Sequence, residues 1–430
     1  MTPKLVALTN PFQATTMRAT TVLRVLLAIQ STFVEGFHFD SEGLVIDVRP
    51  RWKLPRCGEC GTKGRSLHDS RVRTWRHLDL AGMKLQLCYR IRRMPCARCG
   101  TVKTEQVPWA RPSSKFTYAF EERIAYLAQQ SSKTAVVNLM RVAWRTVGWI
   151  IERVVTSYQD EAGDSLDGLR LIGVDELSYM RHHKYVTVVV DHERACVVWA
   201  SEGRSAKTLM RFFDELGEER CGLLEAVTID MSQPYIKAVT EATPGARLIF
   251  DRFHVQRLAQ NALDETRRDE VRAAKTEAAK KDLKGTRWPL QKSEWNLTDS
   301  DVLTLNQLAV TNEPIYHGYL LKAGLVAILD GKQPNVARAR LLTWVEEAKQ
   351  SGLVHFARVG RTIAKHVNGI VEYIRTGLNN GRVEGLNGKT RTITRRSYGF
   401  HSARSLIAMI FLCCGGIDVS PAHSAPQLTH

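Results

Sequence analysis

The alternation of apolar and polar positions divides the chain into segments of different character. Residues 22–30 predict a helix, and residues 43–49 and 83–92 alternate as strands do. Residues 116–157 predict three short helices. The stretch 157–168 is polar, acidic and contains glycine, so we expect a linker there.

After this linker the pattern changes to strands separated by short turns and helices. We expect helices at 206–216 and 234–241 and strands at 169–177, 184–191, 195–201, 226–230 and 247–251. Three strands followed by helix, strand, helix and strand predict a mixed α/β sheet. From residue 253 to about 374 nearly every segment favours helix, which predicts an α-helical insertion.

The length of the chain predicts the number of domains, and its charge predicts a class of partner. A chain of 430 residues is too long for one ordinary core and predicts two to four domains. Its 61 Lys and Arg against 44 Asp and Glu give a net charge of +17, which favours a polyanion such as nucleic acid. Residues 51–115 hold 16 Lys and Arg against 4 Asp and Glu, so the excess is concentrated there. This localisation favours a binding face over a charge that only maintains solubility.

The sequence gives no sign of export or of a membrane partner. No run approaches the ~18 consecutive apolar residues of a membrane span. The first twenty residues have no apolar signal core with a small-residue cleavage site. Nine cysteines that include two CxxC pairs differ from a secreted disulfide scaffold. We therefore expect a cytoplasmic protein, and the missing GxxxxGK[ST] loop predicts that it binds no nucleotide.

Two CxxC pairs lie in the basic segment, Cys57 with Cys60 and Cys96 with Cys99, and a glycine follows each pair. Four thiolates form a closed tetrahedral site for structural zinc, and the strand-like sequence between the pairs suits a zinc ribbon. The alternative is four free or redox-active thiols. The competing ligands are His68 and His77, although each is more often a surface residue or a phosphate contact.

The three helices expected at 116–157 have the layout of a helix-turn-helix. Residues 120–130 are apolar on one face, Ser131 or Ser132 caps the next helix, and residues 144–155 form a basic amphipathic helix after a short turn. In a DNA-binding module of this kind we expect contacts to phosphates or base edges from Arg141, Arg145 and Arg153. The alternative is an ordinary helical bundle.

Two aspartates are expected to end apolar strands, Asp175 in LRLIGVDE and Asp230 in EAVTID. Ionised groups at the end of a buried strand must be paired or bound to metal. Neighbouring carboxylates of this kind hold two divalent metals for phosphoryl transfer. We expect the third carboxylate to be Glu384, in NNGRVEGLNGKTR, because Asn380 and Asn387 share its helical face. The alternatives are turn residues for the aspartates and a solvated helix residue for the glutamate.

Taken in order, these motifs resemble the DDE transposases of bacterial insertion sequences, specifically the ISL3 family. The matching blocks are the CxxC pairs, the helix-turn-helix, GVDE, TIDMSQPYIKAV, DRFHV and NGRVEGLNGKTR, within roughly residues 40–410. The resemblance implies cleavage at terminal inverted repeats and joining of the freed 3′ ends to target DNA. It also implies that Asp175, Asp230 and Glu384 bind two Mg²⁺ ions per active site, for which Mn²⁺ substitutes.

The resemblance further implies a multidomain α+β protein whose RNase H-like mixed α/β core is interrupted by an α-helical insertion. His254 in the DRFHV block is expected to contact the scissile phosphate or move a proton, unless this block only packs the sheet edge. DNA contacts are expected from Arg382, Asn387, Lys389 and Arg391. Double-stranded DNA is the expected partner, with a homodimer forming on it in the bacterial nucleoid.

The predicted domain order follows from these motifs. We expect an N-terminal segment, a zinc-binding domain, a helix-turn-helix, the first part of the core, the insertion, and the final core helix with the tail, at 1–50, 51–112, 113–160, 168–255, 256–375 and 376–430. Two other functions remain open. One is a zinc-containing DNA-binding regulator with a non-catalytic RNase H-like scaffold, and the other is a structure-selective nuclease without strand joining.

Overall fold

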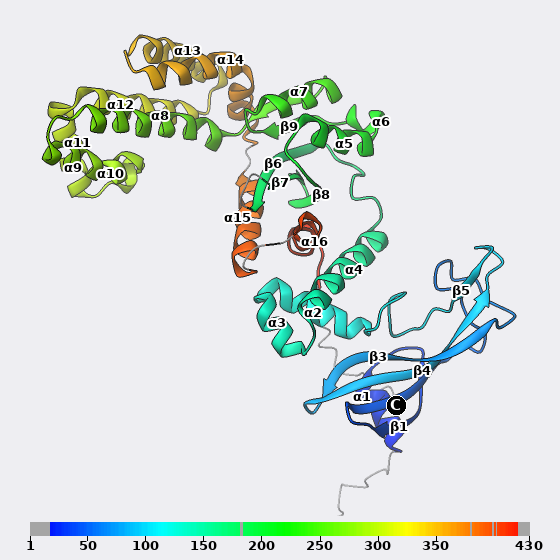
Figure 1. The fold of residues 1–430 in the computed structure, drawn as a ribbon. Helices are drawn as coiled ribbons and strands as arrows, with labels where there is room; N and C mark the ends of the chain where they lie inside the picture. The colour runs from blue at the N-terminus through cyan, green and yellow to red at the C-terminus, as the bar shows by residue number, and fades with distance from the viewer. Residues whose placement is uncertain (1–17, 181–183, 379–380, 398–399, 401, 420–430) are drawn as a thin grey trace, which may run out of the picture. The chain divides into compact units, whose positions relative to one another are not determined.

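The structure is a computed structural model that describes residues 18–180, 184–378, 381–397, 400 and 402–419. Its contacts divide the chain into two compact units (Figure 1). The first takes in the chain up to Val154 and the residues from Asp418 onward, and the second is Val155–Ile417.

The first unit contains a five-stranded sheet preceded by helix α1 (Ala19–Leu27). Strands run in the order β1-β2-β4-β3, with β5 paired to β4; their bounds are β1 (Thr32–Phe39), β2 (Gly43–Pro50), β3 (Asp69–Leu80), β4 (Met83–Pro95) and β5 (Val102–Thr104). The β2–β4 pair is parallel and the β3–β4 pair is an antiparallel hairpin. Strand pairing therefore crosses the domain boundary that the sequence predicted at residue 50.

The β3–β4 hairpin turns at Ala81 and Gly82, which both have positive φ, 50° and 80°. Two such residues form the type I′ turn whose twist matches that of the flanking strands. Beneath the sheet, Trp75 meets Trp109 edge to face with ring centroids 5.5 Å apart. Both side chains are about 1% exposed and form the centre of this core.

Three helices follow the sheet: α2 (Tyr118–Gln130), α3 (Lys133–Met140) and α4 (Trp144–Ala162). Ser132 is the cap of α3, since its hydroxyl accepts from the amide of Ala135 at 3.2 Å. The predicted linker at 157–168 is wrong in its first half, because α4 continues to Ala162. Acidic and polar residues are compatible with helix, and the helix ends only before Gly163, whose φ is 84°.

The second unit is built on a five-stranded mixed sheet in the order β10-β9-β6-β7-β8. Strands β6, β7 and β8 form an antiparallel meander, while β9 and β10 are parallel to β6. The bounds are β6 (Leu171–Met180), β7 (Lys184–Asp191), β8 (Cys196–Glu202), β9 (Ala226–Ile229) and β10 (Arg247–Phe250). The mixed sheet predicted from the sequence is confirmed.

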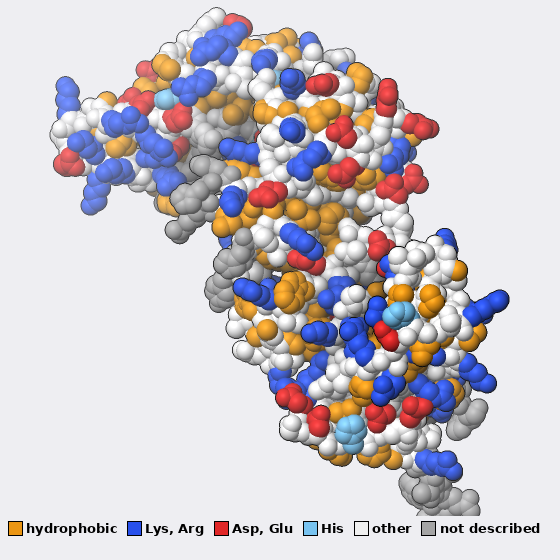
Figure 2. All heavy atoms as spheres, turned by 45° about the vertical axis from the view of Figure 1, so that its right-hand side comes forward, with side chains coloured by type: hydrophobic (Ala, Val, Ile, Leu, Met, Phe, Trp, Pro, Cys, Tyr) orange, Lys and Arg blue, Asp and Glu red, His pale blue; other side chains and the backbone are white. Residues whose placement is uncertain are grey.

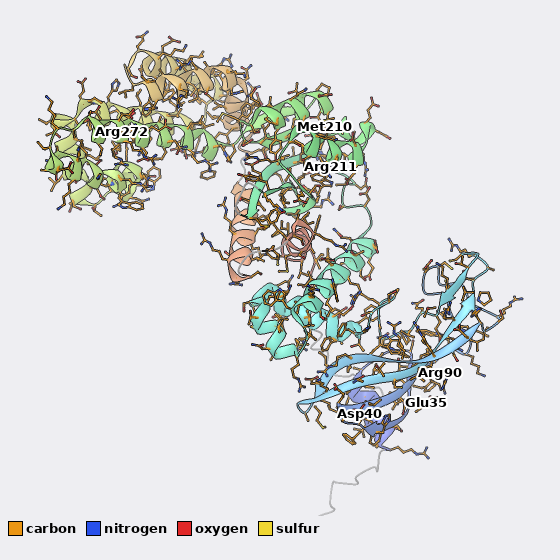
Figure 3. The ribbon with its side chains drawn as sticks, viewed as in Figure 1. Glu35, Asp40, Arg90, Met210, Arg211 and Arg272 are labelled. Atoms are coloured by element: carbon orange, nitrogen blue, oxygen red, sulfur yellow. The ribbon has the colours of Figure 1, made fainter. Side chains whose placement is uncertain are left out.

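Helices cover both faces of this sheet. Helices α5 (Ala206–Leu216), α6 (Glu218–Cys221) and α7 (Gln233–Ala242) belong to the same core as Ile172 and Val174 of β6. On α5, Met210 packs against this core and Arg211 is exposed (Figure 3). On the opposite face, β6 and β7 pack against α16 (Ala403–Cys414) and Leu386 of α15 (Gly381–Arg396).

The helices predicted between residues 253 and 374 are confirmed. They are α8 (Arg252–Ala273), α9 (Glu277–Gly285), α10 (Arg287–Gln291), the 3-10 turn η1 (Glu294–Asn296), α11 (Asp299–Thr311), α12 (Glu313–Leu329), α13 (Pro334–Gln350) and α14 (Val354–Thr376). Helix α14 returns along α8 to β10 (Figure 1). Trp344 lies in this core, while Trp288 and Trp295 are exposed. No helix in the described part of the chain is long and apolar enough to cross a membrane.

Candidate active site and zinc centre

Three aspartates lie level with one another at one edge of the second sheet. Parallel pairing matches Gly173 with Thr228 on β6 and β9, and Ile229 with Phe250 on β9 and β10. Asp230 and Asp251 directly follow their strands. Asp175 is two residues beyond Gly173, as Asp230 is two residues beyond Thr228. The register therefore places Asp175, Asp230 and Asp251 side by side on neighbouring strands.

Asp175 does not end its strand as the sequence predicted, because β6 continues to Met180. The antiparallel partner β7 extends beyond the point where β9 stops and pairs Asp175 with Val188, which keeps β6 extended. Asp175 is thus a strand residue at the place where parallel pairing ends. Leu177 and Val188 on its face belong to the core beneath α15 and α16.

The environment of Asp175 disfavours an isolated negative charge. Burial raises the pKa of Asp175 to about 6, and the charges of Asp230 and Asp251 act in the same direction. A hydrogen bond from the amide of Glu176 and the charge of His254 lower the pKa and only partly offset burial. Crowded, partly buried carboxylates of this kind fit a divalent cation, since hard cations prefer oxygen ligands and neutralise the repulsion.

His254 lies one helical turn from Asp251, at the start of α8. Its Nε2 is 3.7 Å from Oδ2 of Asp251, and its Nδ1 accepts from the guanidinium of Arg257 at 2.7 Å. An accepting Nδ1 leaves the proton of the neutral ring on Nε2, facing the carboxylates. Arg257 is a site residue that was not predicted, although its spacing of three from His254 on a helix was a usable signal.

Glu384 lies in α15, and its side chain is outside the described residues, as are those of Arg382 and Asn387. Asn380 is also outside them. The backbone of α15 packs against β6, the strand that carries Asp175. The structure describes the side chains of two other residues of this helix that were predicted to contact DNA. Lys389 is exposed and donates to the carbonyl of Cys413 at 2.9 Å, and Arg391 is exposed.

The four cysteines of the two CxxC pairs form one cluster in the first unit. Their sulfur atoms all lie within 4.8 Å of one another, with Cys57 3.9 Å from Cys99 and Cys60 3.4 Å from Cys96. A tetrahedron of thiolates at the Zn–S distance of about 2.3 Å has sulfurs about 3.8 Å apart. The donor set and its spacing therefore fit structural zinc.

The two CxxC turns repeat the same backbone. The amide of Gly61 donates to the carbonyl of Cys57 at 3.0 Å, and that of Gly100 to Cys96 at 2.9 Å. Both glycines have φ near 70°, a left-handed conformation that glycine adopts without strain. His77 is outside the cluster: it is buried, and its Nδ1 is 2.8 Å from Oγ1 of Thr117.

The arginines predicted to bind DNA have different environments in the helix-turn-helix. Arg145 is exposed on α4. Arg141 forms an ion pair with Asp79 and donates to the carbonyl of Gly82 at 2.9 Å. Arg153 forms an ion pair with Glu121, whose side chain is fully buried.

Comparison with known proteins agrees with this architecture. A family model described as transposase, of the DDE class and the ISL3 family, matches residues 172–410. A model of the helix-turn-helix domain of transposase family ISL3 matches residues 105–155. A model of the zinc finger of transposases IS204, IS1001, IS1096 and IS1165 matches residues 53–99.

Curated relatives agree along most of the chain. The transposase for insertion sequence element IS1557, in two strains of Mycobacterium tuberculosis, is 36% identical over 449 residues, covering 96% of this chain and 100% of the relative. The transposase for insertion sequence element IS1001 of Bordetella parapertussis is 29% identical over 360 residues, covering 83% and 88%. The chain therefore belongs to the ISL3 family of insertion-sequence transposases.

Proposed function

We propose that this transposase binds the terminal inverted repeats of its element, cleaves the DNA there and joins the freed 3′ ends to target DNA. The observation that carries the proposal is the alignment of Asp175 and Asp230 on adjacent strands, beneath the helix that contains Glu384. We assign Asp175, Asp230 and Glu384 as the metal-binding triad. The order of three antiparallel strands and two parallel strands supports an RNase H-like core, with α8–α14 as its insertion.

The triad would hold two Mg²⁺ ions, for which Mn²⁺ substitutes. Bound in such a site, the metal activates the attacking oxygen and stabilises the leaving oxygen of an in-line phosphoryl transfer. Asp251 belongs to the same cluster and adds negative charge beside Asp230. His254, oriented by Arg257, presents an N–H on the carboxylate side, where it can donate to a phosphate oxygen.

The first unit would recognise the ends of the element. The segment with its zinc ribbon carries the concentrated positive charge of residues 51–115, and Arg145 is exposed on the helix of the helix-turn-helix proposed to meet DNA. Arg382, Asn387, Lys389 and Arg391 are proposed to contact DNA near the carboxylates. Two ends must be handled together, so we propose a homodimer on DNA.

The test is cleavage in vitro of duplex DNA that carries the element's own terminal repeat, with Mg²⁺ or Mn²⁺. Wild type should nick at the repeat boundary, and Asp175→Asn, Asp230→Asn and Glu384→Gln should bind the duplex without cutting it. The matched control is Asp214→Asn on α5, an exposed aspartate away from the cluster, which should cut at the wild-type rate.

Each other outcome identifies a different error. Tight binding without cutting by wild type in either metal would favour a DNA-binding regulator. Cutting without joining, tested with a pre-cleaved 3′ end, would favour a nuclease. If Glu384→Gln is the one variant of the three that still cuts, Glu384 is rejected as the third carboxylate.

A further inference from the structure

A cavity of about 580 Å³ lies in the helical part of the second unit, outside the carboxylate cluster. Its walls are α8, α12 and the turn from α10 into η1. From α8 it is lined by Phe253, Gln256, Arg257 and Gln260. Its volume is within the range of about 300–1,000 Å³ that is usual for small-ligand sites. The proposed cutting and joining steps do not use it.

Helix α8 connects the cavity with the carboxylate cluster, because it begins directly after Asp251 and carries residues of the cavity lining. The four lining residues of α8 recur at spacings of three, four and seven, so they share one helical face. Arg257 lines the cavity and also donates to Nδ1 of His254. Gln260 lies nine residues after Asp251, which on a helix is about 14 Å. A ligand in the cavity is therefore within a few nucleotides of a phosphate at the carboxylates, because stacked nucleotides are about 3.4 Å apart.

Two aromatic side chains line this space, one from α8 and one from η1. Phe253 of α8 is 45% exposed and Trp295 of η1 is 72% exposed, so both leave apolar ring surface open to a ligand. Ala323, Val326 and Ala327 of α12 supply further apolar wall. The lining thus offers flat apolar surfaces to a ligand with flat apolar faces.

Polar groups are placed among these surfaces. The ammonium of Lys322 is buried, donates to the carbonyls of Leu290 and Lys292 at 2.9 and 3.0 Å, and lies 4.8 Å from the ring centroid of Tyr319. Burial lowers the pKa of Lys322 to about 8. Amide groups of the lining glutamines add donors and acceptors, so the site suits a ring with a polar edge.

The lining of the cavity is mixed in charge, with Arg257, Lys292 and Lys322 against Glu294 and Asp330, and the segment that leads into its wall is basic. Residues 267–292, which run from α8 through α10, hold nine Lys and Arg against four Asp and Glu. Several of these cations are exposed on this part of the unit, including Arg272 near the end of α8 (Figures 2 and 3). A base attached to a phosphate backbone combines the flat ring, the polar edge and the charge that this surface fits.

We propose that this cavity receives one unstacked nucleobase of the element's end, within about four nucleotides of the cut, with Trp295 and Phe253 as stacking surfaces. The inference rests on the proposed function, because it takes transposon-end DNA as the ligand. The part of that DNA held by the helical insertion would be a single base near the cut.

The test places 2-aminopurine at single positions along terminal-repeat duplexes and measures its fluorescence with wild type in Ca²⁺, without turnover. One position within about four nucleotides of the cut should change its fluorescence, and its neighbours should not. The Trp295→Ala variant should lose this change and cut between about fivefold and a hundredfold more slowly. Trp295→Phe should restore both.

The control is Trp288→Ala, a tryptophan that is 67% exposed and does not line the cavity. It should match wild type in fluorescence and cutting rate. Melting temperatures of all variants check folding, which exposed side chains affect little. If wild type cuts, but no position responds or Trp295→Ala behaves like Trp288→Ala, the base site is wrong and the transposase proposal stands. If wild type never cuts, a response at one position that Trp295→Ala abolishes still supports the site.

Discussion

Replacing Arg153 by methionine separates two roles that the same residue could have in the helix-turn-helix. The sequence predicts a DNA contact, whereas the structure pairs its guanidinium with Glu121. Glu121 also accepts from Nη1 of Arg111 at 3.1 Å and from the hydroxyl of Ser114 at 2.7 Å. If the ion pair is the main role, Arg153→Met lowers the free energy of unfolding and leaves the DNA affinity of the folded protein unchanged.

The expected loss of free energy of unfolding follows from the burial of the Arg153–Glu121 ion pair. Removing one partner of a buried ion pair costs about 3–5 kcal/mol because the other charge is left without compensation. Here Arg111 remains beside Glu121, and the Arg153 side chain is 30% exposed, so we expect roughly half, about 2 kcal/mol. For a unit of about 150 residues this lowers the melting temperature by about 4–8 °C.

The assay combines thermal unfolding of the full chain with binding of terminal-repeat duplex at several salt concentrations. The control is Arg145→Met on the same helix, which should melt within about 1 °C of wild type because Arg145 is exposed. Its affinity should fall, and its salt slope should decrease by about 1 if Arg145 contacts a phosphate. A wild-type melting temperature for Arg153→Met together with weaker, less salt-dependent binding would refute the structural role.

Three further outcomes are expected. Cys96→Ser should lose bound zinc by elemental analysis, whereas Cys88→Ser, outside the cluster, should keep one zinc per chain. Burial lowers the pKa of His77 to about 4, so the unfolded chain takes up the proton first and stability is lost as pH falls from 6.5 to 4. The free energy of unfolding should fall by about 3 kcal/mol over this range. The His77→Asn variant should not show this fall. Asp175→Asn should raise the melting temperature of the metal-free protein at pH 7. Burial raises the pKa of Asp175 to about 6, so ionising this side chain at pH 7 costs the folded wild type up to about 3 kcal/mol. Mg²⁺ should stabilise the wild type and should no longer stabilise the variant.

The sequence predicted the elements that local pattern determines. The strand at Lys184–Asp191 and the helix at Ala206–Leu216 agree with the structure residue for residue, because their periodicity is strong and turn residues bound them. The zinc cluster was predictable because each CxxC pair is a local turn.

What depends on pairing between distant segments was not predictable. The parallel pairing of β2 with β4 joins residues about forty positions apart, and no local signal announces it. The ion pair of Arg153 with Glu121 has the same origin, since both residues look like exposed helix positions in the sequence. The extension of β6 past Asp175 depends on β7, which supplies hydrogen bonds after β9 has ended.

The start of α8 explains why the carboxylates and the cavity should act together. Strand β10 ends at Phe250, Asp251 follows at the level of Asp230, and α8 begins at the next residue. His254 and Phe253 are therefore adjacent on one helix, with one next to the carboxylates and the other lining the cavity. A helix of 22 residues keeps these groups at a fixed separation. A base held by the cavity would then fix which phosphate lies at the carboxylates. Loss of stacking should therefore spread cleavage over neighbouring phosphates as well as slow it.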